Sequence, residues 1–261
     1  MRILDALTGF IADWDFFFTA GHLAQRAQVT PTMAKLAIDE WLHQGWITAV
    51  DKAIAKGFVI TAKAPTAPNE AAIDAIALLE AMDLDNYRLH RLAYGFGSAL
   101  SFQGMTELVQ KDIYVIAIDQ TVTPFKKPSN RPFARSTKAP TLWGEWRKQR
   151  VYRIRRRPEL LRAYQRLETP YQGVKVPCTA PLRTLIDCWV RPDLAGGEDR
   201  VNDAWKQYLE ANPSTHDAIG REIAAILQDS YAAAWPAMKM AFEAWISSTH
   251  LSLKHRRSDE S

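Results

Sequence analysis

The stretch QVTPTMAKLAIDEWLHQGWI, residues 28–47, carries the start, the buried face and the end of one helix. Thr30 is a suitable N-cap, and Pro31 suits the first helical position because its missing N–H would have no intrahelical partner. Apolar residues then recur at i, i+3, i+4 and i+7, which predicts a buried stripe of Ala34, Ala37, Ile38 and Trp41. Gly45 can end the helix in the left-handed conformation. The stretch therefore predicts a helix from Pro31 to Gln44.

The segments on both sides of this helix extend it to a small domain. Upstream, helical spacing is kept by five apolar residues, Ile3, Leu4, Leu7, Phe10 and Ile11. Thr19 can cap a short second helix. Downstream, GWITAV and GFVIT are short β-type runs joined by DKAIAK. This order of helices, tight turn and two-stranded ribbon is typical of a winged helix-turn-helix, which we expect over residues 1–63. A small helical cap on a larger domain is the alternative interpretation.

A larger region is expected beyond a proline-containing linker at residues 64–70, and few core contacts should cross that linker. Helices are predicted at Ala71–Leu84 and about His90–Gln103. Four more are predicted toward the C-terminal end, at Leu182–Val190, about Arg200–Ala211, Thr215–Leu227 and Tyr231–Trp245. Strands are predicted at Ile113–Ile118, in RVYRI and near GVKVP. The predicted fold class is α+β: a winged helix-turn-helix, then a helix-rich α+β domain over residues 71–250. A basic and polar tail at 251–261 is expected to be disordered.

Positive charge is concentrated in one part of the chain. Between Lys126 and Arg166 there are fourteen Lys or Arg and two Glu, about +12, whereas the whole chain has a formal net charge of +4. The remaining residues therefore sum to about −8. Such segregation indicates a polyanionic partner, and we call residues 126–166 the basic belt. The alternative is a solvated surface with acidic neighbours, and DNA and RNA both remain open as partners of the belt.

The expected DNA contacts fall into two groups. Base readout is expected from the exposed face of the 31–44 helix, at Thr32, Lys35 and Leu36. Phosphate contacts are expected from the ribbon and the basic belt, at Lys52, Lys56, Lys126, Lys127, Arg131, Arg135, Arg150, Arg153, Arg155, Arg156 and Arg157. Within RVYRIRR, the alternation of a strand would turn Tyr152 and Ile154 inward and Arg153 and Arg155 toward solvent. The helix itself has little positive charge, so tight binding would need a homodimer on double-stranded DNA or help from the belt.

The sequence lacks the signals of membrane proteins, secreted proteins and metal- or cofactor-binding proteins. The longest apolar run, IYVIAI, has six residues, whereas a membrane span needs about twenty. No signal peptide is recognised, so a cytoplasmic protein is expected. Cys178 and Cys188 are expected to be reduced and structural, and no cofactor or metal is predicted.

The chain is not expected to be an enzyme. The alternative is a metal-dependent nuclease or another DNA-processing protein with a winged-helix head. Its best candidate site is PDLAGGEDR, with Asp193, Glu198 and Arg200. Those carboxylates lie in a Gly-Gly loop rather than on rigid strands, which favours a solvated turn.

Three stretches of the second region, in order, resemble the AbiEi antitoxins of type IV abortive-infection toxin–antitoxin systems, and the expected N-terminal winged helix also fits that family. The middle stretch is the short strand DIYVIAID, residues 112–119. GSALSFQGMTE, residues 97–107, resembles the family's Ser-Ala-Leu…Gly-Leu helix, and TAPLRTLIDCW, residues 179–189, resembles its Pro-Glu-Arg-Ala-Leu-Leu-Asp segment. Met105 replaces the usual leucine and Leu182 the usual glutamate. The matching residues are Ser98, Ala99, Leu100, Gly104, Pro181, Arg183 and Asp187.

The resemblance implies a DNA-binding repressor of its own operon. The winged helix and the basic belt, for their part, predict salt-sensitive binding to inverted repeats in the protein's own promoter. The resemblance also implies a nucleotidyltransferase-like toxin as partner, counteracted in phage defence without a stable complex. A purely architectural interpretation of both motifs stays open. In that interpretation a glycine ends the first helix, and Arg183 and Asp187 pair at i, i+4 on the second.

Overall fold

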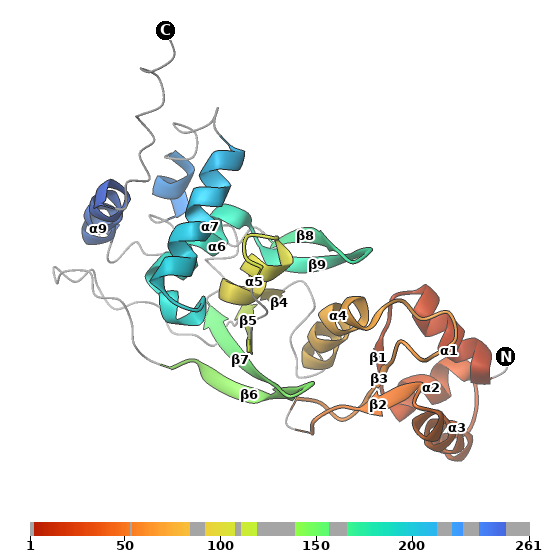
Figure 1. The fold of residues 1–261 in the computed structure, drawn as a ribbon. Helices are drawn as coiled ribbons and strands as arrows, with labels where there is room; N and C mark the ends of the chain where they lie inside the picture. Colours follow the sequence, from red (N-terminus) through yellow and green to blue (C-terminus); the bar gives the residue numbers. More distant parts are fainter. Residues whose placement is uncertain are drawn as a thin grey trace, which may run out of the picture.

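The computed structural model describes residues 3–52, 54–83, 92–107, 111–118, 139–156, 166–212, 221–226 and 235–248. The fold is mixed helix and sheet, as the predicted α+β class requires. A small N-terminal unit lies at one end of the molecule and a six-stranded sheet with its helices forms the rest (Figure 1). None of the helices in the described ranges has the length and apolar character that a membrane span requires.

The N-terminal unit combines three helices with a three-stranded antiparallel sheet. Its elements are α1 (Ile3–Ala12), β1 (Phe17–Phe18), α2 (Ala20–Ala27), α3 (Pro31–Gln44), β2 (Ile47–Ala49) and β3 (Phe58–Ile60). The strand order is β1-β3-β2, and the short strand β1 was not predicted. The predicted helix ends are confirmed: Thr19 and Thr30 accept N–H groups as N-caps, and Gly45 ends α3 with φ 71°.

The core of this unit is local. Its buried residues all lie between Ala6 and Ala64. The aromatic rings of Phe10 and Phe18 stack at 5.1 Å, and Trp41 of α3 meets Phe18 edge-on at 6.3 Å. The predicted stripe of α3 supplies Ala34, Ile38 and Trp41 to this core. Because these rings come from α1, β1 and α3, they fix the helices on the small sheet.

The larger sheet has the strand order β6-β7-β5-β4-β9-β8. Its strands are β4 (Leu92–Tyr94), β5 (Asp112–Ile118), β6 (Thr141–Trp146), β7 (Gln149–Arg156), β8 (Arg166–Tyr171) and β9 (Val174–Thr179). The predicted strands β5, β7 and β9 are confirmed, and β6 and β8 were not predicted. The helix expected at His90–Gln103 is wrong in its first half, because Leu92–Tyr94 form a central strand between β5 and β9. All three of its side chains are buried, so helical and strand patterns look alike there.

Helices from residues 96–248 cover one face of this sheet. They are α5 (Phe96–Phe102), α6 (Pro181–Val190), α7 (Glu198–Ala211), a helical segment at 221–226 and α9 (Trp235–Ser248). The predicted helices at 182–190 and 200–211 are confirmed. Trp189, Trp205, Phe242 and Trp245 form an aromatic group inside this layer, with centroids 4.9–6.1 Å apart. We call the interior on this side the C-terminal face.

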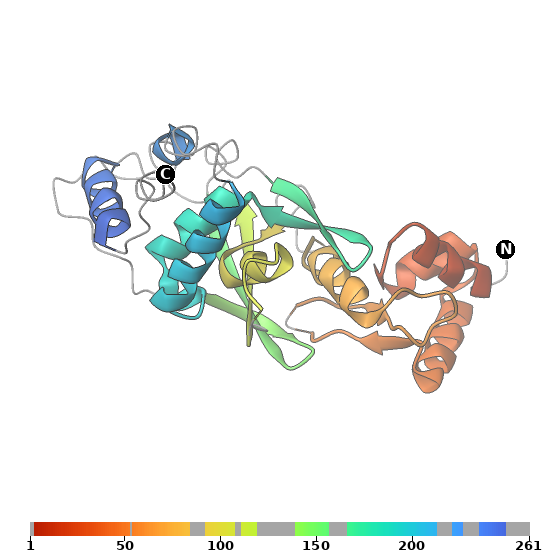
Figure 2. The same cartoon turned by 45° about the horizontal axis from the view of Figure 1, so that its top comes forward.

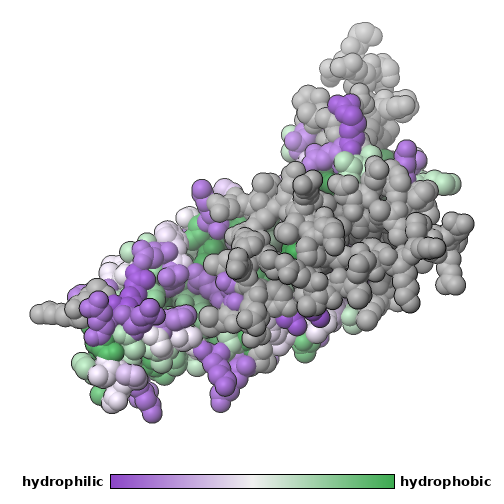
Figure 3. Space-filling model, turned by 180° about the vertical axis from the view of Figure 1, so that it is seen from behind, coloured by the Kyte–Doolittle hydropathy of each residue, from purple (hydrophilic) through white to green (hydrophobic). Residues whose placement is uncertain are grey.

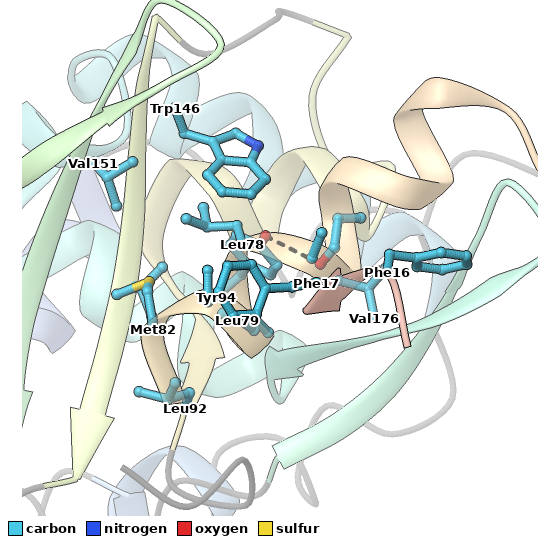
Figure 4. Packing of buried hydrophobic residues seen from close by; sticks show 14 of the residues in the cluster. Phe16, Phe17, Leu78, Leu79, Met82, Leu92, Tyr94, Trp146, Val151 and Val176 are labelled. Atoms are coloured by element: carbon cyan, nitrogen blue, oxygen red, sulfur yellow. Dashed lines mark hydrogen bonds between the residues drawn. The ribbon is translucent and has the colours of Figure 1, made fainter. Parts of the chain in front are cut away.

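The opposite face is covered by α4 (Glu70–Asp83) and by the N-terminal unit. Figure 2 shows α4 between the larger sheet and the N-terminal unit. Leu78, Leu79 and Met82 of α4 pack on the sheet, and Phe16 and Phe17 join the same cluster (Figure 4). We call this interior the shared face, because both regions contribute to it.

The expectation that few core contacts cross residues 64–70 is therefore wrong. Phe16, Phe17, Ile54 and Val59 belong to the same buried cluster as α4 and the strands of the larger sheet. The segment also has structure of its own: Ala64 is buried, and the Glu70 carboxylate accepts the N–H of Ala62 at 2.9 Å. The proline-rich composition was correctly identified, but it forms a packed connection rather than a free linker.

Candidate nucleic-acid interface

Helix α3 presents one open face. The chain leaves α2 through Gln28, which has φ 56°, and reaches the N-cap Thr30 two residues later. The Thr30 hydroxyl accepts the N–H of Met33 at 3.3 Å and so fixes the start of α3. Thr32, Lys35 and Leu36 are all exposed, and Leu36 retains 66% of its accessible surface. The three residues expected to read bases therefore lie together on the side of α3 that faces away from the core.

The charge of this face is low. Asp39 and Glu40 are also exposed on α3, beside Lys35. Residues 1–63 contain six Lys or Arg against six Asp or Glu, so their formal net charge is zero. In Figure 3 this unit, at the left, shows hydrophilic and hydrophobic side chains intermixed. Since phosphate attraction scales with the number of cations, α3 alone offers little non-specific affinity.

The loop of the β2–β3 hairpin is held against the larger region. Ile54, at its tip, keeps 2% of its accessible surface and belongs to the shared face. The Asp51 carboxylate accepts the N–H of Glu145 in β6 at 3.1 Å. Lys52 and Lys56 are exposed on the same loop. Both lysines can thus reach phosphates, but only in the position that the docked loop gives them.

In strand β7, the arginines of RVYRIRR do not all point toward solvent as predicted. Val151 and Ile154 are both buried, although they point to opposite sides of the strand. The reason is that β7 lies inside the sheet, between β6 and β5, with packed layers on both faces. Arg153 is half-buried, and its guanidinium lies 4.4 Å from the centre of the Trp143 ring. The expectation that Arg153 projects freely toward solvent is therefore wrong, whereas Arg155 is exposed as expected.

Of the other residues expected to contact phosphates, one is paired with an acidic residue and the rest lie outside the described residues. Arg150 is exposed but donates to both oxygens of Asp112, at 2.8 and 2.9 Å. Part of its charge is thus compensated locally, as the solvated-surface alternative requires. The side chain of Arg156 and all of Lys126, Lys127, Arg131, Arg135 and Arg157 lie outside the described residues.

The first family-like stretch forms a tightly packed helix end. The Ser98 hydroxyl accepts the N–H of Tyr114 at 2.9 Å and joins α5 to β5. Ala99 and Leu100 are buried. Gly104 has φ 69°, and the next N–H, from Met105, bonds to the Leu100 carbonyl at 2.9 Å. This closure of the helix end needs the left-handed conformation that glycine adopts easily, so the stretch has an architectural role.

The third family-like stretch contains a buried ion pair. Pro181 occupies the first turn of α6, and Leu182 packs in the C-terminal face. The Arg183 guanidinium donates to both oxygens of Asp187, at 3.0 and 2.9 Å, and the two side chains keep 1% and 0% of their accessible surface. The i, i+4 pairing considered from the sequence is confirmed. The bidentate geometry compensates both charges where water does not reach.

The residues of the nuclease alternative do not converge. The Asp193 carboxylate accepts two hydrogen bonds from Arg191, at 2.8 and 2.6 Å, and is exposed. Glu198 lies in the first turn of α7, and Arg200 follows it on the same helix. Within the described ranges, no three His, Cys, Asp or Glu side chains are grouped as metal ligands.

The two cysteines are buried and free, as expected from the sequence. Burial raises the pKa of Cys178 to about 12 and that of Cys188 well above its usual value. Thiols with raised pKa values are poor nucleophiles at neutral pH, so both residues serve packing.

Glu80 on α4 is a residue that sequence reasoning missed. Its Oε2 accepts the N–H groups of Phe16 and Phe17, both at 2.9 Å, and so ties α4 to β1. Burial raises the pKa of Glu80 to about 8, the charge of Asp15 adds to the rise, and the two N–H donors oppose it. Its signal in the sequence was a lone acid within the apolar run AIALLEAM.

Neither a protein-family model nor a curated protein sequence matches the chain.

Proposed function

We propose that the protein is a DNA-binding repressor in which residues 1–63 act as a winged helix-turn-helix and α3 is the recognition helix. The observation that carries this proposal is the exposed row of Thr32, Lys35 and Leu36 on a capped helix that follows α2 after a three-residue turn. The element order α1-β1-α2-α3-β2-β3, with β1 added to the hairpin sheet, supports it further.

The low charge of the N-terminal unit shapes the proposal. A unit with zero formal net charge gains little from phosphate contacts, so a homodimer on an inverted repeat would double the base contacts. Additional phosphate contacts would come from Lys52, Lys56 and the basic belt. This arrangement makes the protein a reader of short palindromic sites in double-stranded DNA.

The resemblance to AbiEi antitoxins extends the proposal to a biological setting. In that setting the protein represses its own toxin–antitoxin operon and counteracts a nucleotidyltransferase-like toxin in the cytoplasm during phage defence. No stable complex with the toxin is required. The buried Arg183–Asp187 pair and the Ser98–Tyr114 bond would then maintain the body that carries the antitoxin activity.

The DNA-binding proposal is tested by measuring affinity for the inverted repeats of the protein's own promoter and for random DNA. Lys35→Ala and Thr32→Ala should reduce the preference for the repeats, because they remove base contacts. Lys239→Ala, on the distant helix α9, is the matched control. Replacing Arg155, Arg156 and Arg157 should weaken binding to both DNAs. It should also reduce the slope of log affinity against log salt concentration by roughly 0.9 for each lost phosphate contact. Equal losses on both DNAs in the α3 variants would contradict base readout by α3.

The antitoxin proposal is tested by co-expression with the product of the adjacent gene. Full-length protein should relieve growth arrest. Because the N-terminal unit shares a core with the rest, repression and neutralisation are separated with point variants rather than by truncation. Lys35→Ala should lose promoter repression and, with the toxin expressed from an independent promoter, still restore growth. Failure of the full-length protein to restore growth would contradict the antitoxin role while leaving DNA binding intact.

A further inference from the structure

A cavity of about 240 Å³ lies where the first turns of α4 meet α5 and the larger sheet. Its lining includes Asp74 of α4, Tyr94 of β4, Ser101 and Phe102 of α5, Trp146 of β6 and Tyr171 of β8. Figure 4 shows Trp146 and Tyr94 on this side of the shared face. The size suits a ligand of one or two rings rather than a drug-sized molecule.

Trp146 brings an unused donor to this cavity. The side chain keeps 5% of its accessible surface, and its Nε1 is buried without a hydrogen-bond partner among the described residues. The indole lies near the Asp74 carboxyl and helps to lower that pKa, but its N–H makes no hydrogen bond to the carboxyl that meets normal geometry. A buried donor left without an acceptor is costly, so an acceptor supplied by a ligand would be favourable here.

Asp74 brings an acceptor next to that donor. Burial raises the pKa of Asp74 to about 6, and the neighbouring Arg147 guanidinium opposes the rise. Arg147 Nε lies 3.0 Å from Asp74 Oδ1, and the same guanidinium pairs with Glu70. One cation thus serves two carboxylates, which leaves a local negative charge beside the Trp146 donor.

Aromatic rings form the remaining wall. The Phe102 ring lies 4.6 Å from Tyr94 and 4.8 Å from Tyr171, measured between centroids. The Tyr94 hydroxyl already donates to the Ala75 carbonyl at 3.1 Å, so this ring is held in place. Fixed aromatic surfaces of this kind bind flat, polarizable rings by stacking or edge contacts.

These features favour one class of ligand over the other simple ones. A phosphate or carboxylate would be repelled by Asp74 and Glu70, and an aliphatic ligand would leave the Trp146 N–H unpaired. A metal ion would compete with Arg147 for the two carboxylates and would find an N–H donor on its other side. A flat heterocycle with an acceptor beside a donor satisfies every group.

We propose that this cavity binds a nucleobase, whose ring nitrogen or carbonyl accepts from Trp146 Nε1 and whose amino group donates to Asp74. The base can belong to a free nucleoside or to single-stranded nucleic acid, because both present the same ring. The proposal concerns α4 and the larger sheet, and it stands whether or not α3 reads double-stranded DNA.

The test is calorimetric titration of the full chain with adenosine, cytidine, hexadeoxyadenylate and an abasic hexanucleotide. We expect measurable binding of the first three and none of the abasic strand beyond phosphate attraction. Binding of adenosine or cytidine alone would identify a nucleoside site, and binding of the hexanucleotide alone would identify a single-strand site. Trp146→Phe should weaken binding about tenfold, as loss of one buried hydrogen bond does. Trp143→Phe, in the same strand but outside the cavity lining, should leave it unchanged.

A second measurement uses the unaltered protein, in case Trp146→Phe fails to fold. The nine indole N–H signals are followed by nitrogen–proton NMR during titration with adenosine, and the Trp146 signal should move most. Absence of binding by all base-containing probes at millimolar concentration would overturn the proposal. Binding that leaves the Trp146 signal in place, or that weakens equally in both tryptophan variants, would also overturn it.

Discussion

The two faces of the larger sheet are covered in different ways. The C-terminal face is closed by α5, α6, α7 and α9, all from the same region of the chain as the sheet. The shared face is closed by α4 together with Phe16, Phe17 and Ile54 from the N-terminal unit. One interior is therefore internal to its region, while the other joins two regions. The difference shows that the N-terminal unit and the larger region share one buried core.

The faces also differ in how they treat buried charge. On the C-terminal face Arg183 and Asp187 compensate each other with two hydrogen bonds. On the shared face the partners of Glu80 within the described ranges are the backbone N–H groups of Phe16 and Phe17, and its pKa is raised to about 8. An ion pair contributes a nearly constant amount to the free energy of unfolding over a wide pH range. A buried acid without a cationic partner makes the free energy of unfolding depend on pH. The joint between the two regions is thus the pH-sensitive part of the interior.

Cutting the chain at the connection should have the largest effect. A fragment of residues 70–261 would expose α4 and the sheet where Phe16, Phe17 and Ile54 cover them, so we expect no cooperative unfolding transition. A fragment of residues 1–69 keeps its complete local core and should retain helical structure with reduced stability. Circular dichroism during thermal unfolding compares them. A stable, cooperative 70–261 fragment would show that the shared face is a mere contact between independent domains.

Breaking the ion pair of the C-terminal face should come next. Asp187→Ala removes the carboxylate that pairs with the buried Arg183 guanidinium and should reduce the free energy of unfolding by about 3–5 kcal/mol. Asp112→Ala removes the partner of the exposed Arg150 and should have a much smaller effect on stability. Urea titration of both variants gives the comparison. Replacing Arg183 and Asp187 together by Met and Leu should recover most of the loss, and no recovery would argue against uncompensated charge as its cause.

Removing the hairpin's contribution to the shared face should have an intermediate effect. Ile54→Ala deletes a buried side chain between the two regions and should cost about 2–4 kcal/mol. Leu36→Ala, which shortens an exposed side chain on α3, should change stability by less than about 0.5 kcal/mol. The same urea titrations measure both. A negligible effect of Ile54→Ala would mean that the hairpin loop rests on the surface without contributing to the core.

The sequence predicted local elements well because their signals are local. Thr30, Pro31 and Gly45 mark the ends of α3 within one short stretch, and the structure has those ends. The open face of α3 follows from the same periodicity. Leu92–Tyr94 was misassigned because a strand buried on both faces shows no alternation. Arg153 was placed toward solvent because alternation cannot reveal that β6 and packed layers surround β7.

Neither the candidate cavity nor the shared face could be predicted from the sequence, and the reason is the same for both. Trp146, Asp74 and Phe102 are far apart in the chain and meet only through the strand order. Glu80 was visible as a lone acid in an apolar helix, but its partners, the N–H groups of Phe16 and Phe17, are more than sixty residues away. A proline-rich segment between two regions indicates a turn in the chain and says nothing about which surfaces then meet.

The smallest predicted effect tests the pH sensitivity of the shared face through Glu80→Gln. The pKa of Glu80 is 4.5 in the unfolded chain and about 8 in the fold, so the folded state holds more protons between those values. Its contribution to the free energy of unfolding is present below pH 4.5 and is lost as the pH rises toward 8. Glutamine keeps an oxygen for the two N–H donors and does not ionise. A full shift from 4.5 to about 8 would correspond to roughly 4 kcal/mol, but the Glu80 side chain is only half-buried, so solvent reduces the effect. The variant should therefore be close to the wild type near pH 5 and exceed it by about 1–2 kcal/mol at pH 8. Urea titration at both pH values measures the difference, with Glu243→Gln on exposed α9 as the control that should show none. An equal difference at both pH values would mean that Glu80 acts through shape, and the two faces would then not differ in their response to pH.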